Sequence, residues 1–280
     1  MNDQNDQTRF QVALITDVFY DDNPRQRLAD RLGEAKQLGA ELAVLPEIPC
    51  LPWAPATKNA RDEHAEEPGG PSHQMQADAA RAVGIGLVGG VIQRNPDTGS
   101  RYNTSLVFDA HGELLGTHQK WHLPEEPAFW ETSHYEPGVD PPTVIDGFRM
   151  PLGVQICSDI NRPEGTHILA AMGAQLIVNP RATEAETYWK WKPVFQANAV
   201  TSCTYIVSVN RPGPDGVGMG GPSLVVAPDS SIMVETTDPV HVVALDRSFI
   251  DQRRIAYPGY LPVRADLYAQ GWAKVKTTTG

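Results

Sequence analysis

In three segments of the chain, a largely apolar run is followed by a side chain that can take part in covalent catalysis. These side chains are Glu47 after LAVLP, Lys120 after LLGTHQ, and Cys157 after GVQI. A cysteine thiol is a weak nucleophile until a base or a positive charge favours its thiolate. Glu47 could take that proton, and Lys120 could stabilise negative charge that develops on a substrate. The backbone N–H of Ser158 is a second candidate donor to such an oxyanion. These residue types fit nucleophilic catalysis by a thiol.

Each of these residues also has an ordinary structural interpretation. A lone cysteine is more often a small buried apolar residue than a nucleophile, and a glutamate or lysine at the end of a strand is usually solvated. In α/β proteins, side chains at the carboxyl ends of strands gather at one edge of the sheet. The carboxylate, the ammonium and the thiol could therefore meet at one edge if these strands are neighbours.

The rest of the chain alternates short apolar strands with amphipathic helices. Strands are predicted at 11–16, 41–45, 85–93, 102–109, 113–119, 152–156, 175–178, 204–209, 223–227 and 242–245. Helices are predicted at 25–38, 74–83, 165–173 and 185–202. This pattern predicts an α/β sandwich with sheets inside and helices outside. No change of composition marks a boundary, so we predict one domain at 9–268, with tails at 1–8 and 269–280.

Composition and charge exclude several classes of protein. The 280 residues are 41% hydrophobic and carry a formal net charge of −11, and no Lys/Arg cluster is longer than Arg253-Arg254. Such an acidic chain repels nucleic acid, and no apolar stretch reaches the roughly 20 residues of a membrane span. We therefore expect neither nucleic acid nor a membrane as partner. A polar first segment and three cysteines without a CxxC pair lead us to expect a cytoplasmic location.

One pair of histidines has a spacing that could suit a metal ion. His118 and His122 are four residues apart, which on a helix would place them on one face. They lie at the end of a predicted hairpin instead, and no HExxH sequence is present. We predict no metal site.

The three segments resemble the glutamate, lysine and cysteine motifs of the nitrilase superfamily of carbon–nitrogen hydrolases. LAVLPEI, GTHQKWHLP and GVQICSDINRPEG follow in the family's order and at separations of the family's kind. Shorter matches occur at 102–105, 179–180, 208–211 and 221–223, so the resemblance runs from about residue 9 to 268. It implies an αββα sandwich of the carbon–nitrogen hydrolase type and catalysis without a cofactor.

The resemblance also implies a role for each residue. Glu47 deprotonates Cys157, which attacks the carbon of an amide or nitrile, while Lys120 and the N–H of Ser158 hold the oxyanion. Ammonia leaves, a thioester remains on Cys157, and a water molecule activated by Glu47 releases the acid. Many members have a second glutamate that positions the lysine, and alignment assigns that role to Glu131. Three other glutamates lie nearby in the same loop: Glu125, Glu126 and Glu136.

The residues after the nucleophile favour an amide over a nitrile. Nitrilases of the superfamily tend to carry Trp-Glu after the cysteine, whereas this chain has Ser158-Asp159 and then Pro163-Glu164, which is similar to the amidase and carbamoylase branches. We therefore predict a thiol amidohydrolase that releases ammonia from a small amide or N-carbamoyl compound. A nitrilase is the main alternative. Acyl transfer to an amine and an inactive binding homologue are the others.

Five side chains lie in segments that the resemblance places near the substrate: Trp53, Trp130, Tyr135, Arg181 and Tyr188. Arg181 could bind a substrate carboxylate through two parallel hydrogen bonds. It could equally form a structural ion pair with Glu184 or Glu186. Selective loss of affinity for carboxylate-bearing substrates in Arg181→Leu would distinguish these interpretations.

The resemblance further implies a homodimer or a higher homo-oligomer. In the family two sandwiches usually pair through helices into an αββααββα assembly. The helices predicted at 165–173 and 185–202 are the candidate faces. Residues 254–268 resemble the family's C-terminal arm, and would otherwise be a surface tail.

Overall fold

A computed structural model of the chain describes residues 8–213 and 217–276, so most of the tail expected at 1–8 lies outside the described residues. The strands are β1 (Arg9–Leu14), β2 (Leu42–Val44), β3 (Gly86–Arg94), β4 (Arg101–Phe108), β5 (Leu114–Gln119), β6 (Glu125–Glu126), β7 (Phe129–Trp130), β8 (Leu152–Val154), β9 (Leu176–Arg181), β10 (Tyr205–Asn210), β11 (Ser223–Val226), β12 (Ile232–Thr236) and β13 (His241–Asp246). The α-helices are α2 (Pro24–Gln37), α3 (Pro71–Val83), α4 (Pro163–Ala171), α5 (Tyr188–Ser202), α6 (Arg247–Ile255) and α7 (Ala265–Trp272). Short 3₁₀ helices are η1 (Ala54–Ala56), η2 (Asp62–His64), η3 (Glu131–Ser133), η4 (Cys157–Asn161) and η5 (Ala185–Thr187).

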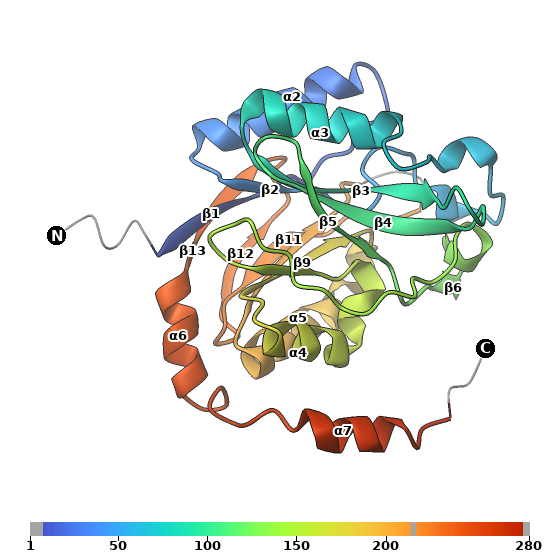
Figure 1. Ribbon diagram of the computed structural model, residues 1–280. Coiled ribbons are helices and arrows are strands. Elements are labelled where there is room, and N and C mark those ends of the chain that lie inside the picture. Colours follow the sequence, from blue (N-terminus) through green and yellow to red (C-terminus); the bar gives the residue numbers. More distant parts are fainter. Residues whose placement is uncertain (1–7, 214–216, 277–280) are drawn as a thin grey trace.

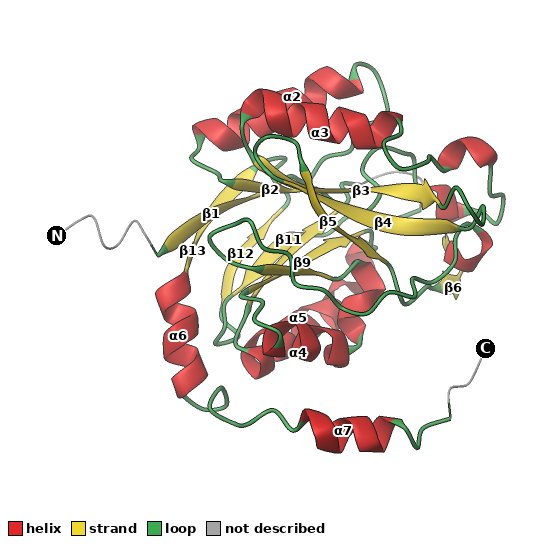
Figure 2. Cartoon of the chain, in the orientation of Figure 1, coloured by secondary structure: helices red, strands yellow, loops and turns green. Residues whose placement is uncertain are grey.

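Two mixed sheets stack face to face, and helices cover their outer faces (Figures 1 and 2). One sheet has the strand order β13-β1-β2-β3-β4-β5, and the other has the order β12-β11-β10-β9-β8. Helices α2 and α3 lie over the first sheet, and α4 and α5 lie over the second (Figure 1). The predicted α/β sandwich is therefore confirmed.

The layers are held together by apolar side chains that alternate along the strands. In β1, Val12 and Leu14 belong to the cluster between the sheets, whereas Ala13 belongs to the cluster under α2 and α3. Leu28 and Leu32 lie one turn apart on the buried face of α2 and are fully buried. Truncating Leu32 to Ala would cost about 2–5 kcal/mol, because a cavity adds to the lost burial.

The strands that precede Glu47, Lys120 and Cys157 are not neighbours. Strands β2 and β5 belong to the first sheet and are separated by β3 and β4, whereas β8 is the edge strand of the second sheet. The condition that the three strands be neighbours in one sheet is therefore not met. The residues meet because the two stacked sheets bring these strand ends to the same end of the sandwich.

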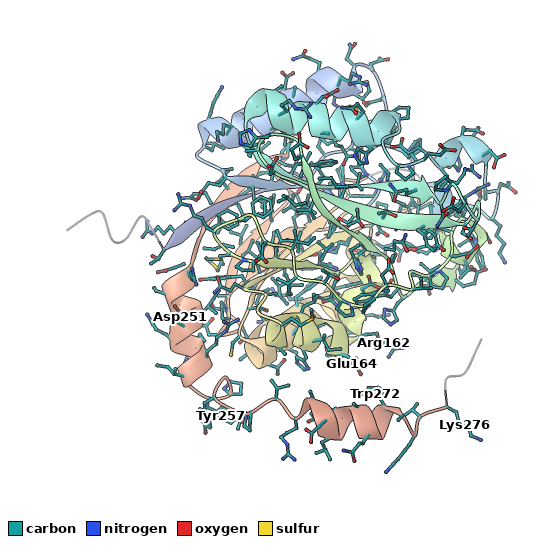
Figure 3. The ribbon with its side chains drawn as sticks, viewed as in Figure 1. Arg162, Glu164, Asp251, Tyr257, Trp272 and Lys276 are labelled. Atoms are coloured by element: carbon teal, nitrogen blue, oxygen red, sulfur yellow. The ribbon has the colours of Figure 1, made fainter. Side chains whose placement is uncertain are left out.

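Three elements at the C-terminal end of the chain were not predicted from the sequence. These are β12, α6 and α7, and α7 crosses the boundary at residue 268 that we drew between domain and tail. From Leu261 to Lys276 every residue is exposed, and α7 lies apart from the sandwich, as Figure 3 shows around Trp272. Between 121 and 143 the prolines predict a loop with a short helix; the structure has the short 3₁₀ helix η3 there, and also the hairpin β6–β7, which was not predicted.

The described residues also bear on membranes and cysteines. Within residues 8–213 and 217–276, every helix is too short or too polar to cross a bilayer. Cys50, Cys157 and Cys203 are free thiols, and all three are buried.

Candidate active site

A fully buried ammonium lies between two carboxylates at the meeting point of the sheets. Lys120 Nζ donates to Glu47 Oε1 at 2.8 Å and to both oxygens of Glu131, at 2.7 and 2.6 Å. Lys120 and Glu131 are 0% exposed, and Glu47 is 2% exposed. Charges are this deeply buried only when they are paired, and such pairs are strongly coupled. The structure therefore brings Glu47, Lys120 and Glu131 together.

Glu47 is held so that one of its oxygens stays available. Asn103 Nδ2 donates to Glu47 Oε1 at 2.6 Å, the same oxygen that accepts from Lys120. Within the described part of the chain, Glu47 Oε2 is buried and has no hydrogen-bond partner. Directly after β10, Arg211 Nη1 donates to the backbone carbonyls of Glu47 at 3.1 Å and of Ile48 at 2.6 Å. A buried acceptor without a partner is costly, which suits an oxygen that takes up a proton during turnover.

Cys157 occupies a sharp turn between β8 and η4. Its φ of 46° lies in the left-handed region, which residues with a Cβ seldom adopt. Asn179, on β9, fixes this turn because its Nδ2 donates to the carbonyls of Gln155 at 2.7 Å and of Cys157 at 3.2 Å. The thiol itself is 3.8 Å from the carbonyl oxygen of Ala182. Strain of this kind persists where the surrounding contacts over-determine it, and it is frequent at catalytic residues.

The electrostatics of the cluster keep the nucleophile neutral at rest. Burial raises the pKa of the Cys157 thiol well above its ordinary value, the charge of Glu47 adds to this, and Lys120 opposes it. Burial alone would lower the pKa of Lys120, but the charges of Glu131 and Glu47 outweigh it and raise that pKa. Burial also raises the pKa of Glu131. The site therefore holds a protonated thiol close to a fixed ammonium and a carboxylate that can act as base.

Cys157 opens onto a cavity of about 360 Å³, large enough for a small organic substrate. Ser158 lies beside it and follows Cys157 in the first turn of η4, where backbone N–H groups have no partner within the helix. The other lining residues come from the β6–β7 hairpin, η4, the loop after β9 and the start of α5: Pro124, Glu126, Pro127, Phe129, Asn161, Ala182, Thr183, Glu184, Thr187, Lys190 and Trp191.

None of the five side chains expected near the substrate lines this cavity. Trp53 is buried, and its ring centroid is 5.9 Å from that of Phe129, which does line the cavity. Lys58 lies over the ring of Trp130 at 4.0 Å. Tyr135 accepts from Asn103 at 3.4 Å, and Tyr188 donates to Glu235 at 2.7 Å.

Arg181 is fully buried and is bonded within the protein. It donates to Ser208 Oγ at 2.9 Å, to Thr183 Oγ1 and to the carbonyl of Pro222. Among the described residues it makes no ion pair with the two glutamates expected from the sequence, and burial lowers its pKa to about 10. Its guanidinium therefore faces neutral acceptors.

Sequence reasoning missed the residues that do line the cavity. Phe129, Thr183 and Trp191 come from three separate elements, and no local pattern distinguishes them from core residues. Glu131 was distinguished from its neighbours only by alignment. Its burial agrees with that choice, because Glu125, Glu126 and Glu136 are all exposed.

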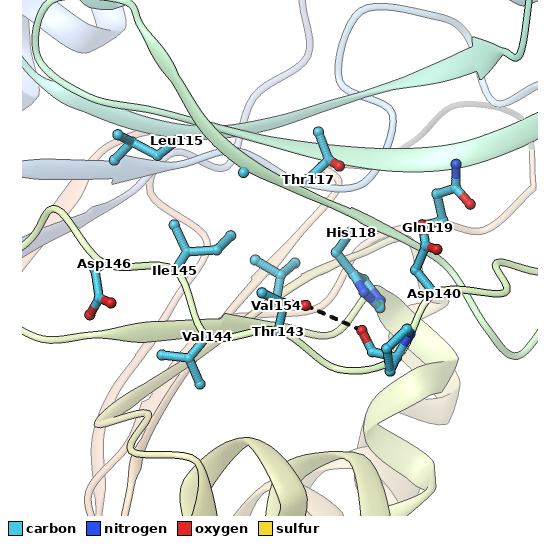
Figure 4. Close-up of a pocket in the computed structure, with 12 residues that line it drawn as sticks. Leu115, Thr117, His118, Gln119, Asp140, Thr143, Val144, Ile145, Asp146 and Val154 are labelled. Carbon is cyan, nitrogen blue, oxygen red and sulfur yellow. Dashed lines mark hydrogen bonds between the residues drawn. The ribbon is translucent and has the colours of Figure 1, made fainter.

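A second hollow of about 510 Å³ lies away from Cys157 (Figure 4). It runs between β5 and the loop 140–146, along the edges of the two sheets. His118 and Gln119 reach it from β5, and Val154 reaches it from β8. Because Cys157 lines the smaller cavity and does not line this hollow, we assign the chemistry to the smaller cavity.

Comparison with known proteins agrees with this geometry. A family model described as carbon–nitrogen hydrolase matches residues 18–254. The omega-amidase NIT2 of Homo sapiens is 30% identical over 275 residues, which cover 94% of this chain and 98% of that protein. The chloroplastic omega-amidase of Arabidopsis thaliana is 30% identical over 280 residues, which cover 93% and 74% of the two chains.

Solved structures agree as well. Saccharomyces cerevisiae Nit3, a member of branch 10 of the nitrilase superfamily, superposes with a TM-score of 0.78 at 26% identity, over 92% of this chain and 96% of that one. An amidase of the superfamily from Nesterenkonia AN1 gives 0.75 at 25% identity, over 94% and 97%. With its sandwich fold and its buried cluster beside a cysteine, the chain belongs to the carbon–nitrogen hydrolase family, in the nitrilase superfamily.

Proposed function

We propose that this protein is a thiol amidase that hydrolyses the C–N bond of a small primary amide through a thioester on Cys157. One observation carries the proposal: a cysteine in a strained turn opens onto a cavity and lies within electrostatic reach of Glu47, Lys120 and Glu131. A base, a cation and a nucleophile with these properties are what acyl transfer from an amide requires.

In this mechanism Glu47 Oε2 takes the thiol proton as Cys157 Sγ attacks the amide carbon. The carbonyl oxygen becomes an oxyanion, which the ammonium of Lys120 and the N–H of Ser158 stabilise. Collapse of the intermediate breaks the C–N bond, and Glu47 returns the proton to the departing ammonia. Water, deprotonated by Glu47, then attacks the thioester, so that one water is consumed and the acid and the free thiol are released. Glu131 does not line the cavity and acts by holding Lys120.

The substrate class is suggested by relatives and by the size of the cavity. The relatives described above are named omega-amidases. A cavity of about 360 Å³ suits a chain of a few carbon atoms. We therefore propose short ω-amides as the first substrates to test, ahead of N-carbamoyl compounds.

The test is an ammonia-release assay over short ω-amides, simple aliphatic amides, N-carbamoyl amino acids, ureas and nitriles, with Cys157→Ala beside the wild type. We expect release from amides, one water consumed per ammonia, and no release in the variant. Release from nitriles alone, with two waters consumed, would replace the amidase by a nitrilase. Release that persists in Cys157→Ala would refute the proposed nucleophile.

We also propose that the active protein is a homodimer that uses its C-terminal segment. Residues 256–276 extend away from the sandwich and expose large apolar side chains, among them Tyr257, Leu267 and Trp272 (Figure 3). Exposed apolar surface of this extent is typical of an interaction site. Light scattering should show a dimer for the full chain and a monomer after deletion of residues 256–280. A deletion of 277–280 is the matched control, and a monomeric full chain would refute the proposal.

A further inference from the structure

The two loops that carry Lys120 and Cys157 meet at one buried carboxylate. Asp159, in η4, is fully buried and lies two residues after the nucleophile. Its Oδ1 accepts from the backbone N–H groups of Trp121 and His122, each at 3.0 Å. Its Oδ2 accepts from the backbone N–H of Ile156 at 3.1 Å.

The position of these donors in the chain is the important feature. Trp121 directly follows Lys120, and Ile156 directly precedes Cys157. One rigid group of three atoms therefore fixes the backbone next to the catalytic ammonium and the backbone next to the catalytic thiol. The two loops follow β5 and β8, which belong to different sheets. Ser158 Oγ also donates to the carbonyl of His122, but of these two side chains only that of Asp159 accepts from the backbone on both sides.

Two histidine rings complete the coordination of this carboxylate. His118 Nε2 lies 2.9 Å from Asp159 Oδ2, and His122 Nδ1 lies 3.0 Å from Oδ1. Burial alone would raise the pKa of Asp159, but the hydrogen bonds from His118 and His122 outweigh it and lower that pKa to about 2. The group is therefore a carboxylate in the working range of an enzyme, with both oxygens occupied by donors.

We infer that Asp159 is a positioning residue, which sets the placement of the Lys120 ammonium relative to the Cys157 thiol. The inference rests on the proposed function only in that these two groups are taken to be the catalytic ones. Asp159 does not line the cavity around Cys157, so it acts through the two loops and not on the substrate. His118, which contacts Asp159 through its ring, also lines the second hollow (Figure 4).

Asp159→Asn tests the inference because it keeps the shape and replaces one acceptor oxygen by a donor. The Asn side chain has one acceptor oxygen and one NH₂ group. The backbone N–H groups of one of the two loops must therefore face the NH₂ group, which cannot accept their hydrogen bonds. A displacement of about 1 Å in a catalytic group can cost about a hundredfold in rate. We expect kcat for ammonia release to fall about a hundredfold with KM changed less than about threefold.

A second readout does not depend on the substrate. Alkylation of Cys157 by iodoacetamide at fixed pH should slow at least about tenfold in Asp159→Asn, because the ammonium no longer favours the thiolate to the same extent. The matched control is Asp140→Asn, because Asp140 is an exposed aspartate that lies further along the chain from Lys120. This variant should keep wild-type rates in both assays. Equal alkylation rates in the two variants would overturn the inference. The alkylation result stands even if the wild type releases ammonia from no amide tested, so the two proposals fail separately.

If Asp159→Asn does not fold, His118→Asn carries the test, since it removes one ring donor and leaves the backbone donors in place. We then expect a partial fall in kcat, with alkylation slowed in the same direction and KM unchanged. Wild-type kcat and alkylation in a folded His118→Asn, beside an unfolded Asp159→Asn, would reduce Asp159 to a purely structural role and overturn the inference.

Discussion

Replacing Glu131 by Gln should separate two proposed roles, that of Glu131 in holding the Lys120 ammonium and that of Glu47 as the base. Glu131 accepts two of the three hydrogen bonds that Lys120 donates, at 2.7 and 2.6 Å. Gln has a similar shape but offers one acceptor oxygen and no charge. The variant therefore loses about one charge-assisted hydrogen bond, which is typically worth about 1.5–3 kcal/mol.

The consequence for catalysis follows from where the ammonium goes. Without its anchor, Lys120 pairs more closely with Glu47, which weakens the base and moves the cation from the place where the oxyanion forms. If about 2–3 kcal/mol is lost in the transition state alone, kcat falls about 30- to 150-fold. KM should change little, because Glu131 does not line the cavity.

The assay is steady-state ammonia release from the best amide, with circular dichroism to confirm the fold. Glu136→Gln is the matched control, because Glu136 is an exposed glutamate in the same loop. It should keep wild-type kinetics. A folded Glu131→Gln with kcat within about threefold of the wild type would refute the reasoning, since Lys120 would then need no second carboxylate.

Three further predictions follow from the buried groups. Because burial and the charge of Glu47 raise the pKa of Cys157, its alkylation rate should still be rising above pH 9, and a plateau below pH 7 would contradict this. Arg181→Leu should lower the free energy of unfolding by about 2–4 kcal/mol in urea denaturation, because buried acceptors lose their donor. KM should change equally for carboxylate-bearing and neutral amides, and a selective change would restore the substrate clamp. The Asp159 pKa of about 2, against an ordinary 3.8, should contribute about 2 kcal/mol of stability. This contribution should be present above pH 4 and lost as the pH falls towards 2; an equal pH dependence in a folded Asp159→Asn would exclude it.

The sequence predicted what depends on neighbours along the chain. The period of apolar residues located β3 and β4 to within a residue or two, and the three motifs identified Glu47, Lys120 and Cys157 as a group. Helix α7 was missed because none of its residues is buried in this chain. Its sequence therefore shows no apolar face of the kind that identified the other helices. Strand β12 was missed because it is only five residues long and none of its side chains is fully buried.

What the sequence could not predict depends on contacts between distant segments. Asp159 was visible only as part of a motif, and its contacts with the loop after β5 are about 40 residues away in the chain. Arg181 was expected at the substrate because its segment is near the site. Its direction, inward to Ser208, depends on how β9 pairs with β10.

The left-handed conformation of Cys157 has a consequence for how this enzyme can evolve. A residue with a Cβ costs about 1–2 kcal/mol more at this φ than glycine does. Cys157→Gly should therefore be folded and inactive, and more stable than Cys157→Ala by about that amount. Selection for stability alone would remove the nucleophile from this position. Under the proposed mechanism, a lineage that no longer needs the reaction would gain stability by replacing the thiol of Cys157 with glycine.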